Sequence, residues 1–300
     1  MARIISFINY KGGVGKTTTT FHIGCGLAMF HNKRILFVDA DPQTNLTFLC
    51  GNFANWQTQV DANGSIETLY RSFVEGTPFS IRTIIWGHPL NHAQLQHIDL
   101  IPSNITLLDI DLRLQATTKP STTIREIAHT HLSQRSILAN SLSEVLDEYD
   151  YILIDCPPNL YLATQNALYA SDGYLVTLLP DFFSTIGVEF LDRRVSQLLR
   201  ERSLAQQILD LPTITPIPFF LAFVRVNVTA ARTQITPREQ MAIVRGLPRS
   251  AGRCFDAITE DYKDIREAAE RQNPVFIVSP GSQNSQNYRQ MTDEFLRNFP

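Results

Sequence analysis

The sequence predicts an α/β fold with a doubly wound, mainly parallel β-sheet, and three observations support this class. Short apolar runs rich in β-branched residues recur along the chain, and most are continuous rather than alternating, as in strands buried on both faces. Helical stretches separate these runs, and a strand–helix–strand order is typical of a parallel sheet covered by helices. The 300 residues contain neither a repeat nor a clear linker, so we expect a single domain over residues 1–300.

Seven segments are predicted strands, and helical segments lie between them. The predicted strands are Arg3–Asn9, Arg34–Asp39, Ile98–Pro102, Tyr151–Asp155, Gly173–Leu179, Phe219–Val226 and Val275–Val278. The predicted helices are Lys16–Phe30, Ile137–Glu148, Ala163–Ala170, Ile186–Arg202, Pro237–Gly246 and Ser285–Asn298. Residues 51–97 interrupt this order, and we expect an insertion of helices and loops there. The polar residues 116–136 interrupt it again, as a mobile segment.

Composition limits the function classes. Hydrophobic residues make up 44% of the chain and charged residues 18%, which excludes a disordered chain, a collagen and a coiled coil. The net charge of −3 argues against a globally basic nucleic-acid binder, although a local basic face remains compatible with it. The four cysteines form no CxxC pair, which is typical of buried thiols in a reducing compartment. No signal peptide or membrane-spanning stretch is evident, so we expect a cytoplasmic protein.

The strongest functional signal is a glycine-rich segment, Lys11–Thr18, between the first predicted strand and the first predicted helix. It fits the variant KGGxGK[ST] of the phosphate-binding loop, and a plain strand-to-helix turn is the alternative. Its glycines allow backbone N–H groups to approach phosphates, and the helix directs its positive N-terminus at them. Lys16 would bridge the β- and γ-phosphates, and Thr17 would bind Mg²⁺. The expected nucleotide ligands are Gly12, Gly13, Val14, Gly15, Lys16, Thr17 and Thr18.

This segment, KGGVGKTTTT, resembles the deviant Walker A motif of the ParA/MinD family of P-loop ATPases. The resemblance covers nearly the whole chain and is thinnest in residues 51–97, 116–136 and 204–218. It implies ATP and Mg²⁺ as cofactors and a homodimer that sandwiches two ATP molecules. In that family the first lysine, which matches Lys11, reaches across the dimer interface to the partner's nucleotide.

Acidic residues end two further predicted strands. Asp39–Gln43 resembles the family's DxDPQ segment, and by that resemblance Asp41 orients the attacking water while Asp39 supports the metal. An Asx-capped turn is the alternative for this segment. The run Tyr151–Asp155 has the Walker B pattern, in which the terminal acid contacts Mg²⁺, usually through water. It resembles the family's IDxPP motif, with Cys156 where threonine or serine is usual.

The C-terminal third carries further similarity to the family. Asn227 follows a predicted strand, at the place where the family has an asparagine that contacts adenine. Residues 265–276 resemble the family's IREA…GxPV stretch, with Gln272 and Asn273 in place of the usual glycine. By the same resemblance, Asn45 and the residues after it would form a nucleotide-sensing switch.

The family contains DNA-segregation and cargo-positioning ATPases, the membrane-bound MinD, and iron–sulfur relatives. No cluster-type pair of cysteines follows the phosphate loop, which argues against the last of these. The C-terminal segment has an apolar helical face, but its polar face is neutral. This favours a helix packed on the sheet over the basic amphipathic helix of a membrane-bound protein, so we expect no membrane partner.

A local excess of arginine favours the DNA-binding branch. Between Arg225 and Arg253 six arginines accompany a single acid, Glu239. Such clustering is typical of binding to the phosphate backbone, and a solvated helix face is the alternative. The candidate DNA ligands are Arg232, Arg245, Arg249, Arg253, Lys263 and Arg266.

These observations lead to one functional hypothesis and two alternatives. The hypothesis is a ParA-like ATPase, nucleoid-associated, that dimerises on ATP and binds DNA nonspecifically. A ParB-like or cargo adaptor protein would stimulate its slow hydrolysis of ATP, and the cargo would be a plasmid, a chromosome or a protein assembly. The chain starts directly at the first strand, so we expect no N-terminal helix-turn-helix domain. The alternatives are a MinD-like scaffold at a membrane and a regulatory ATPase that uses the dimer switch without DNA.

Overall fold

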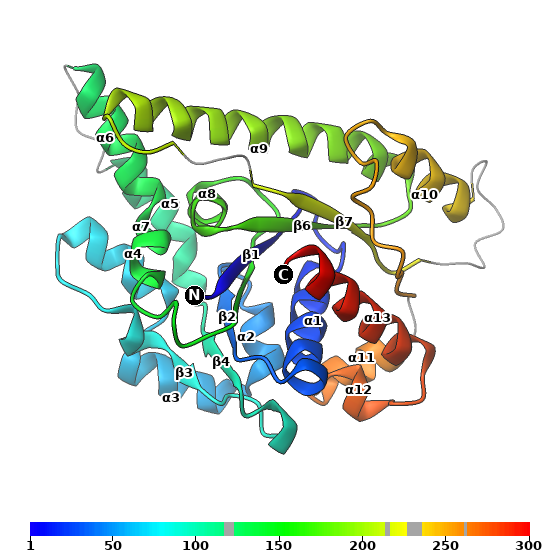
Figure 1. Cartoon of the computed structure of the whole chain (residues 1–300). Helices are drawn as coiled ribbons and strands as arrows, with labels where there is room; N and C mark the ends of the chain where they lie inside the picture. Colours follow the sequence, from blue (N-terminus) through cyan, green and yellow to red (C-terminus); the bar gives the residue numbers. More distant parts are fainter. Residues whose placement is uncertain (117–122, 214–216, 227–235, 261–262) are drawn as a thin grey trace.

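The computed structural model, which describes residues 1–116, 123–213, 217–226, 236–260 and 263–300, contains a seven-stranded β-sheet with helices on both faces (Figure 1). The strand order is β3-β4-β2-β5-β1-β6-β7. Every neighbouring pair is parallel except β3 and β4. The strands are β1 (Arg3–Ile8), β2 (Ile35–Asp39), β3 (Trp86–Gly87), β4 (Ile98–Ile101), β5 (Tyr151–Asp155), β6 (Gly173–Leu178) and β7 (Phe219–Phe223). The predicted fold class, doubly wound and mainly parallel, is confirmed.

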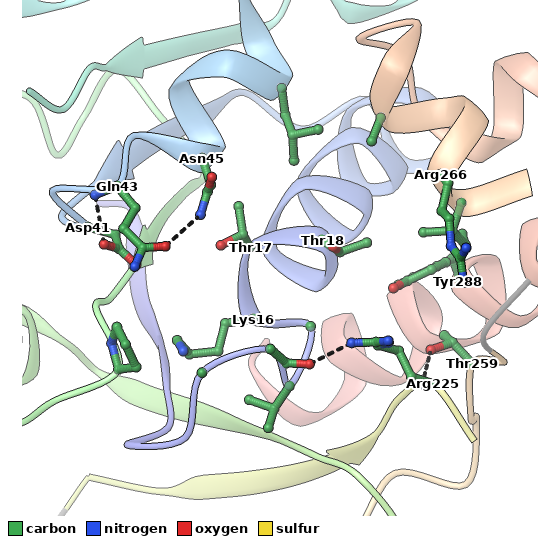
Figure 2. Close-up of a pocket in the computed structure, with 18 of the residues that line it drawn as sticks. Lys16, Thr17, Thr18, Asp41, Gln43, Asn45, Arg225, Thr259, Arg266 and Tyr288 are labelled. Carbon is green, nitrogen blue, oxygen red and sulfur yellow. Dashed lines mark hydrogen bonds between the residues drawn. The ribbon is translucent and has the colours of Figure 1, made fainter. Parts of the chain in front are cut away.

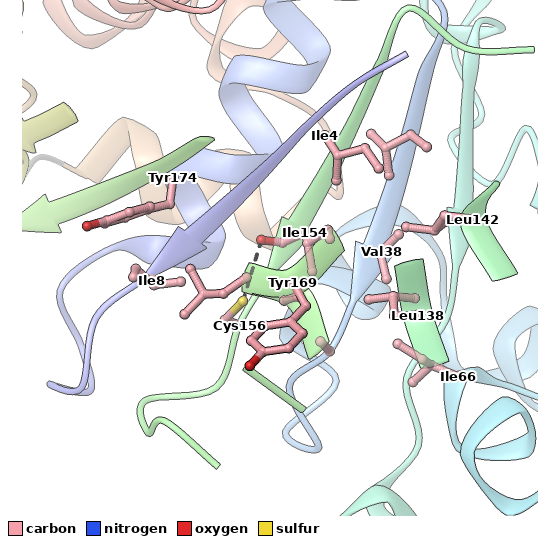
Figure 3. Packing of buried hydrophobic residues seen from close by; sticks show 14 of the residues in the cluster. Ile4, Ile8, Val38, Ile66, Leu138, Leu142, Ile154, Cys156, Tyr169 and Tyr174 are labelled. Carbon is pink, nitrogen blue, oxygen red and sulfur yellow. Dashed lines mark hydrogen bonds between the residues drawn. The ribbon is translucent and has the colours of Figure 1, made fainter. Parts of the chain in front are cut away.

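Strand β1 shows why the apolar runs are continuous. It lies between β5 and β6, and its side chains enter two separate hydrophobic cores. Ile4 and Ile8 belong to one core, whereas Ile5 and Phe7 belong to the other. Figure 3 shows the first of these cores, in which Ile4 and Ile8 share a layer with residues from the covering helices. A strand with water on one face would have alternated instead.

The helices divide between these two cores. Helices α1, α2, α11, α12 and α13 contribute to the core around Ile5 and Phe7, and α4, α5, α7, α8, α9 and α10 contribute to the core around Ile4 and Ile8. The bounds are α1 (Lys16–His31), α2 (Asn45–Cys50), α3 (Phe53–Asn63), α4 (Ile66–Glu75), α5 (Leu108–Ala116), α6 (Ile124–Arg135), α7 (Ile137–Leu142), α8 (Leu162–Ala170), α9 (Phe182–Ile208), α10 (Pro237–Gly246), α11 (Lys263–Glu270), α12 (Val275–Val278) and α13 (Gln283–Asn298).

The C-terminal helix α13 packs against α1 (Figure 1). Its apolar residues Met291 and Phe295 are fully buried. Gly26 permits the close approach, because a Cβ there would lie 2.4 Å from the hydroxyl oxygen of Thr292. Phe295 also packs on Phe7 of β1 and Tyr151 of β5, so the prediction that this apolar face packs on the sheet is confirmed, and α1 covers it as well. None of the helices in the described ranges has the length and apolarity needed to cross a bilayer.

The prediction of a strand at Val275–Val278 is wrong, since these residues form the short helix α12. Pro274 is its N-cap residue, and proline has a φ suited to the start of a helix and no backbone N–H to donate to a strand ladder. The backbone N–H of Val275 donates instead to Nε2 of His22, at 3.1 Å. Burial of Val275 and Phe276 explains the apolar composition without a strand.

The prediction of a mobile polar segment at residues 116–136 is wrong for its second half, which forms α6. Thr123 and Glu126 make a capping box at the helix start, a T-x-x-E signal that the sequence does contain. Residues 117–122 lie outside the described ranges. The inserted segment 51–97 contains α3, α4, two short 3₁₀ turns and the edge strand β3.

Several boundaries differ from expectation. The predicted helix 137–148 ends at Leu142, where turns take over, and α9 extends well beyond the predicted Ile186–Arg202 in both directions. Strand β7 ends at Phe223, before the predicted Val226. Helix α11 was not predicted at all, because the polar sequence Lys263–Glu270 buries only Ala268.

A buried histidine joins α1 to the C-terminal elements. Nδ1 of His22 donates to the carbonyl oxygen of Thr18 at 2.8 Å, and Nε2 accepts from Val275. Its ring stacks on Tyr288, with 4.4 Å between ring centroids. Burial lowers the pKa of His22 to about 4, so this histidine is neutral and fixed as one tautomer at neutral pH.

The neutral form of His22 should make stability depend on pH. Its pKa in the folded protein lies below the usual value of about 6.5, so its contribution is complete above pH 6.5 and is lost as the pH falls toward 4. The shift corresponds to about 3 kcal/mol. We expect the free energy of unfolding, measured with urea from pH 7 to pH 4.5, to fall more steeply in the wild type than in His22→Gln. The exposed control His97→Gln should follow the wild type, and parallel curves for all three proteins would contradict the assignment.

Candidate functional site

A cavity of about 440 Å³ lies at the carboxyl ends of the central strands (Figure 2). One wall is the loop between β1 and α1, and the opposite wall comes from the C-terminal third of the chain. Its lining residues are Gly12, Gly13, Val14, Gly15, Lys16, Thr17, Thr18, Asp41, Gln43, Asn45, Leu49, Pro158, Arg225, Thr259, Glu260, Ile265, Arg266, Ala269 and Tyr288. All the nucleotide ligands expected from the glycine-rich segment are among them, and Asn227 lies outside the described residues.

The glycine-rich loop adopts backbone angles that favour glycine. Gly13 and Gly15 have φ values of 72° and 71°, in the left-handed region. A Cβ at Gly15 would also lie 3.1 Å from Cγ2 of Val224. The sequence therefore needs glycine here for conformation and for space, and the resulting loop leads directly into the N-terminus of α1.

Lys16 and Thr17 begin α1 and face the cavity (Figure 2). Lys16 is only 6% exposed, and its Nζ lies 3.4 Å from the carbonyl oxygen of Lys11. The hydroxyl of Thr17 donates to Oδ2 of Asp155 at 2.6 Å. The Walker B acid and the phosphate loop are thus joined directly.

Asp155 has the properties of a metal-supporting acid. It is completely buried, and burial raises its pKa well above the usual range. Its Oδ1 atom accepts no hydrogen bond from any described residue, which leaves a buried oxygen suited to a cation or its water. The described residues contain no group of three or more His, Cys, Asp or Glu side chains that could hold a metal. A Mg²⁺ ion would therefore need phosphate and water ligands besides Thr17 and Asp155, as is usual for this ion.

Asp39 and Asp41 occupy different environments. Oδ2 of Asp39 accepts from the backbone N–H and the hydroxyl of Thr47 at 2.8 Å and 2.7 Å, and Oδ1 accepts from the backbone N–H of Asp41. Burial raises the pKa of Asp39 to about 7, and Asp39 does not line the cavity. Its visible role is to fix the loop that carries Asp41.

Asp41 does line the cavity. Its Oδ1 accepts from the backbone N–H of Gln43 at 2.9 Å. Burial raises the pKa of Asp41, whereas this hydrogen bond and the charge of Lys16 act in the opposite direction. Of the two acids in the DxD segment, the structure brings only Asp41 to the place where a reacting group could be reached.

Arg225 is the main feature of the cavity that the predicted set of nucleotide ligands left out. Its Nη1 donates to the carbonyl oxygen of Gly13 at 2.8 Å, and its backbone N–H donates to the hydroxyl of Thr259 (Figure 2). Its φ of 53° is in the left-handed region, which is strained for arginine and common at functional sites. The signals for it in the sequence are the excess of arginine around it and its place two residues before Asn227, the predicted adenine contact. Tyr288 and Arg266 complete this wall.

Lys11 is placed differently from Lys16. It does not line the cavity, and its side chain is 35% exposed. Its Nζ makes an ion pair of 2.6 Å with Asp181, which follows β6. Within one protomer, Lys16 therefore faces the cavity, whereas Lys11 lies outside it and pairs with Asp181.

The candidate DNA ligands are dispersed. Lys263 is exposed and pairs with Glu267 at 2.8 Å, whereas Arg266 lines the cavity. Arg249 pairs with the buried Asp192. Arg245 donates to the carbonyl oxygen of Phe255, and Arg253 lies over the ring of Phe219. Arg232 lies outside the described residues.

Comparisons with known proteins agree with this geometry. A family model described as an AAA domain matches residues 2–208. A ParA family protein of Chlamydia pneumoniae is 28% identical over 98% of this chain and 97% of its own length. The chain belongs to the ParA family of P-loop ATPases.

Other relatives support the ParA assignment. The sporulation initiation inhibitor protein Soj of Bacillus subtilis is 27% identical over 99% of this chain and 100% of its own length. Among solved structures, apo McdA of Cyanothece has a TM-score of 0.70 at 18% identity, covering 99% of this chain and 100% of that one. An ATP complex of a McdA variant has a TM-score of 0.71 at 18% identity, covering 98% and 96%. At this identity the two structures show a shared fold.

The contact between Arg225 and Gly13 predicts a role in holding the phosphate loop ready for ATP. Arg225→Ala and Arg225→Gly both remove the contact, so both should weaken Mg-ATP binding about tenfold, or about 1.4 kcal/mol. The glycine variant should be the more stable of the two by about 1 kcal/mol, because alanine retains the left-handed strain. Isothermal titration and urea unfolding measure the two effects. Arg238→Ala is the exposed control, and unchanged ATP affinity in both Arg225 variants would contradict the role.

Proposed function

We propose that this ParA-family ATPase binds Mg-ATP in the cavity, dimerises on it, and hydrolyses it slowly while the dimer holds nonspecific DNA. A ParB-like or cargo adaptor partner stimulates hydrolysis, and the cycle positions or segregates the cargo. The observation that carries the proposal is the convergence of Lys16, Thr17 and Asp41 on one cavity, with the buried Asp155 hydrogen-bonded to Thr17 behind its lining. These side chains come from the ends of three strands, and their proximity supports a role in phosphoryl transfer.

Each residue has a distinct task in this proposal. The backbone N–H groups of the loop and the ammonium of Lys16 hold the phosphates, and the buried position of Lys16 strengthens this attraction. Thr17 and Asp155 hold Mg²⁺, which when bound neutralises charge on the phosphates. Asp41 orients the attacking water, and this task depends on the position of its carboxylate more than on proton transfer to it.

The position of Lys11 supports a sandwich dimer. It lies outside its own cavity and is exposed enough to leave Asp181 for a partner's phosphates. Exposed apolar side chains lie around it. Tyr10 precedes Lys11 in the chain and contacts Gly187 of α9. Ile186 and Phe190, on one face of α9 near Gly187, are exposed as well. Their exposed fractions of 42%, 53% and 65% support a surface that another protomer covers.

The proposal that the dimer binds DNA rests on the basic C-terminal third. Lys263 is 87% exposed and Arg249 is 57% exposed, so their charges reach solvent despite their acidic partners. Dimerisation doubles such a surface, and each added phosphate contact strengthens binding through counterion release. The coverage of the apolar face of α13 favours DNA over a membrane as the surface that the dimer holds.

Asp41→Ala should separate ATP binding from hydrolysis. Lys16 and Thr17 remain, so Mg-ATP affinity should stay within about threefold, while kcat falls by about 100-fold or more. The variant should accumulate as an ATP-bound dimer in size-exclusion chromatography. The exposed control Asp61→Ala should behave as the wild type. Loss of ATP binding, or hydrolysis at the wild-type rate, would show that Asp41 has another role.

Charge reversal in the basic C-terminal third of the sequence should weaken DNA binding without affecting ATP binding. We expect Arg232→Glu with Lys263→Glu to reduce affinity for unrelated duplexes about tenfold or more and to flatten the salt dependence. Wild-type binding should require ATP rather than ADP in an electrophoretic shift assay. The double reversal Arg113→Glu with Arg125→Glu, on α5 and α6, matches the change in net charge. Equal binding with ATP and ADP, or an equal loss in both double variants, would remove the DNA proposal.

A further inference from the structure

Helices α6, α8 and α9 enclose a cationic cluster outside the nucleotide site. Arg202 on α9 is only 8% exposed, and its guanidinium lies 4.6 Å from the ring centroid of Tyr169. Arg135 on α6 donates from Nε to Gln165 at 2.7 Å. His131, one turn before Arg135, contacts the hydroxyl of Tyr169 at 3.0 Å. Figure 3 shows Tyr169 with its hydroxyl pointing away from the strands.

No acid among the described residues forms an ion pair with this cluster, although the charge of Glu201 is near enough to oppose the lowering of the Arg135 pKa by burial. No carboxylate among the described residues lies within 4.0 Å of either guanidinium. The acid on the facing helix, Glu201, accepts from Gln197 instead. Tyr169 and His131 are neutral at pH 7, because burial raises the pKa of the first to about 12 and lowers that of the second to about 4. Burying guanidinium groups without counter-ions is costly.

A cavity of about 150 Å³ adjoins the cluster. Arg135 and Arg194 line it together with the amide side chains of Gln165 and Gln197 and with Glu201. Among the described residues, Nη2 of Arg135 has no acceptor. The cavity has about a third of the volume of the nucleotide cavity, so it has room for a small tetrahedral anion and not for a nucleotide.

We propose that this cavity binds a phosphate group, held by the guanidinium of Arg135 with Arg194 and the two glutamine amides as further donors. Arginine suits a phosphate because its donors form a planar fork. The anion would also give Arg135 a directly bound counter-charge, which none of the described carboxylates supplies. Leu160 lines this cavity and Pro158 lines the nucleotide cavity, so the linings of the two cavities come within two residues of each other along the chain.

The phosphate can be free or part of a nucleic-acid backbone, and the first experiment tests the shared site. Phosphate binding is measured by equilibrium dialysis and thermal unfolding with saturating ADP and Mg²⁺, so that the phosphate loop is filled. Chloride at matched ionic strength is the reference. We expect one phosphate per chain and a rise in Tm of about 2–4 °C. ADP binding is recorded in the same samples, so failure of the nucleotide proposal is seen separately.

Variants identify the site. Arg135→Gln should lose phosphate binding and the rise in Tm, yet be no less stable than the wild type without phosphate, because it removes a partly buried charge that has no ion-pair partner. Arg194→Gln should weaken binding severalfold, and the exposed control Arg200→Gln should not. Absence of bound phosphate in the ADP-saturated wild type would overturn the proposal. Equal binding by Arg135→Gln and the wild type would overturn it too.

A competition experiment then distinguishes the two sources. If a backbone phosphate occupies the cavity, duplex binding in ATP should fall in Arg135→Gln, and inorganic phosphate should displace the duplex from the wild type more than matched chloride does. If free phosphate is the occupant, duplex binding should be equal in the two proteins. Either result supports a phosphate site, and each assigns its source.

Discussion

The hydrogen bond between Thr17 and Asp155 is the interaction on which the site depends. It joins the first turn of α1 to the end of β5, while β1 and β5 pair in parallel beside it. Asp155 is buried and keeps one oxygen without a partner among the described residues, so the folded chain retains a carboxylate that a cation would stabilise. Lys16, which precedes Thr17, is also buried beside this pair. Burial of Asp155 and Lys16 costs the free protein stability, and a bound Mg-nucleotide would offset that cost by giving both groups partners.

The wall opposite the phosphate loop is supplied by the C-terminal third. Arg225 reaches from the end of β7 to the carbonyl of Gly13, and Tyr288 from α13 lies against the buried His22 of α1. These contacts join the C-terminal part of the chain to the phosphate loop and to the helix α1 that follows it. Helix α11 lines the same cavity with Ile265, Arg266 and Ala269 and also carries the exposed Lys263, so the nucleotide cavity and this part of the surface share one element.

The sheet and the motifs could be predicted from the sequence because each leaves a local pattern. Strands buried on both faces read as continuous apolar runs, and the glycines of the loop reflect positive φ values and close packing. Val275–Val278 has the same apolar composition, but burial against α1 produced it, so the pattern predicted a strand wrongly. The left-handed Arg225 and the pairing of Lys11 with Asp181 could not be predicted, since both arise from contacts between residues far apart in the chain.

The central claim is that the two lysines of one loop act on two different nucleotides. Mg-ATP binding and ATP-dependent dimerisation, measured on Lys16→Ala and Lys11→Ala in parallel, test it most directly. Lys16→Ala should bind no measurable ATP, because it removes the charge that faces the phosphates of its own cavity. Lys11→Ala should bind ATP nearly as the wild type does and remain monomeric. Near-normal ATP affinity in a folded Lys16→Ala, or normal dimerisation of Lys11→Ala, would contradict the account.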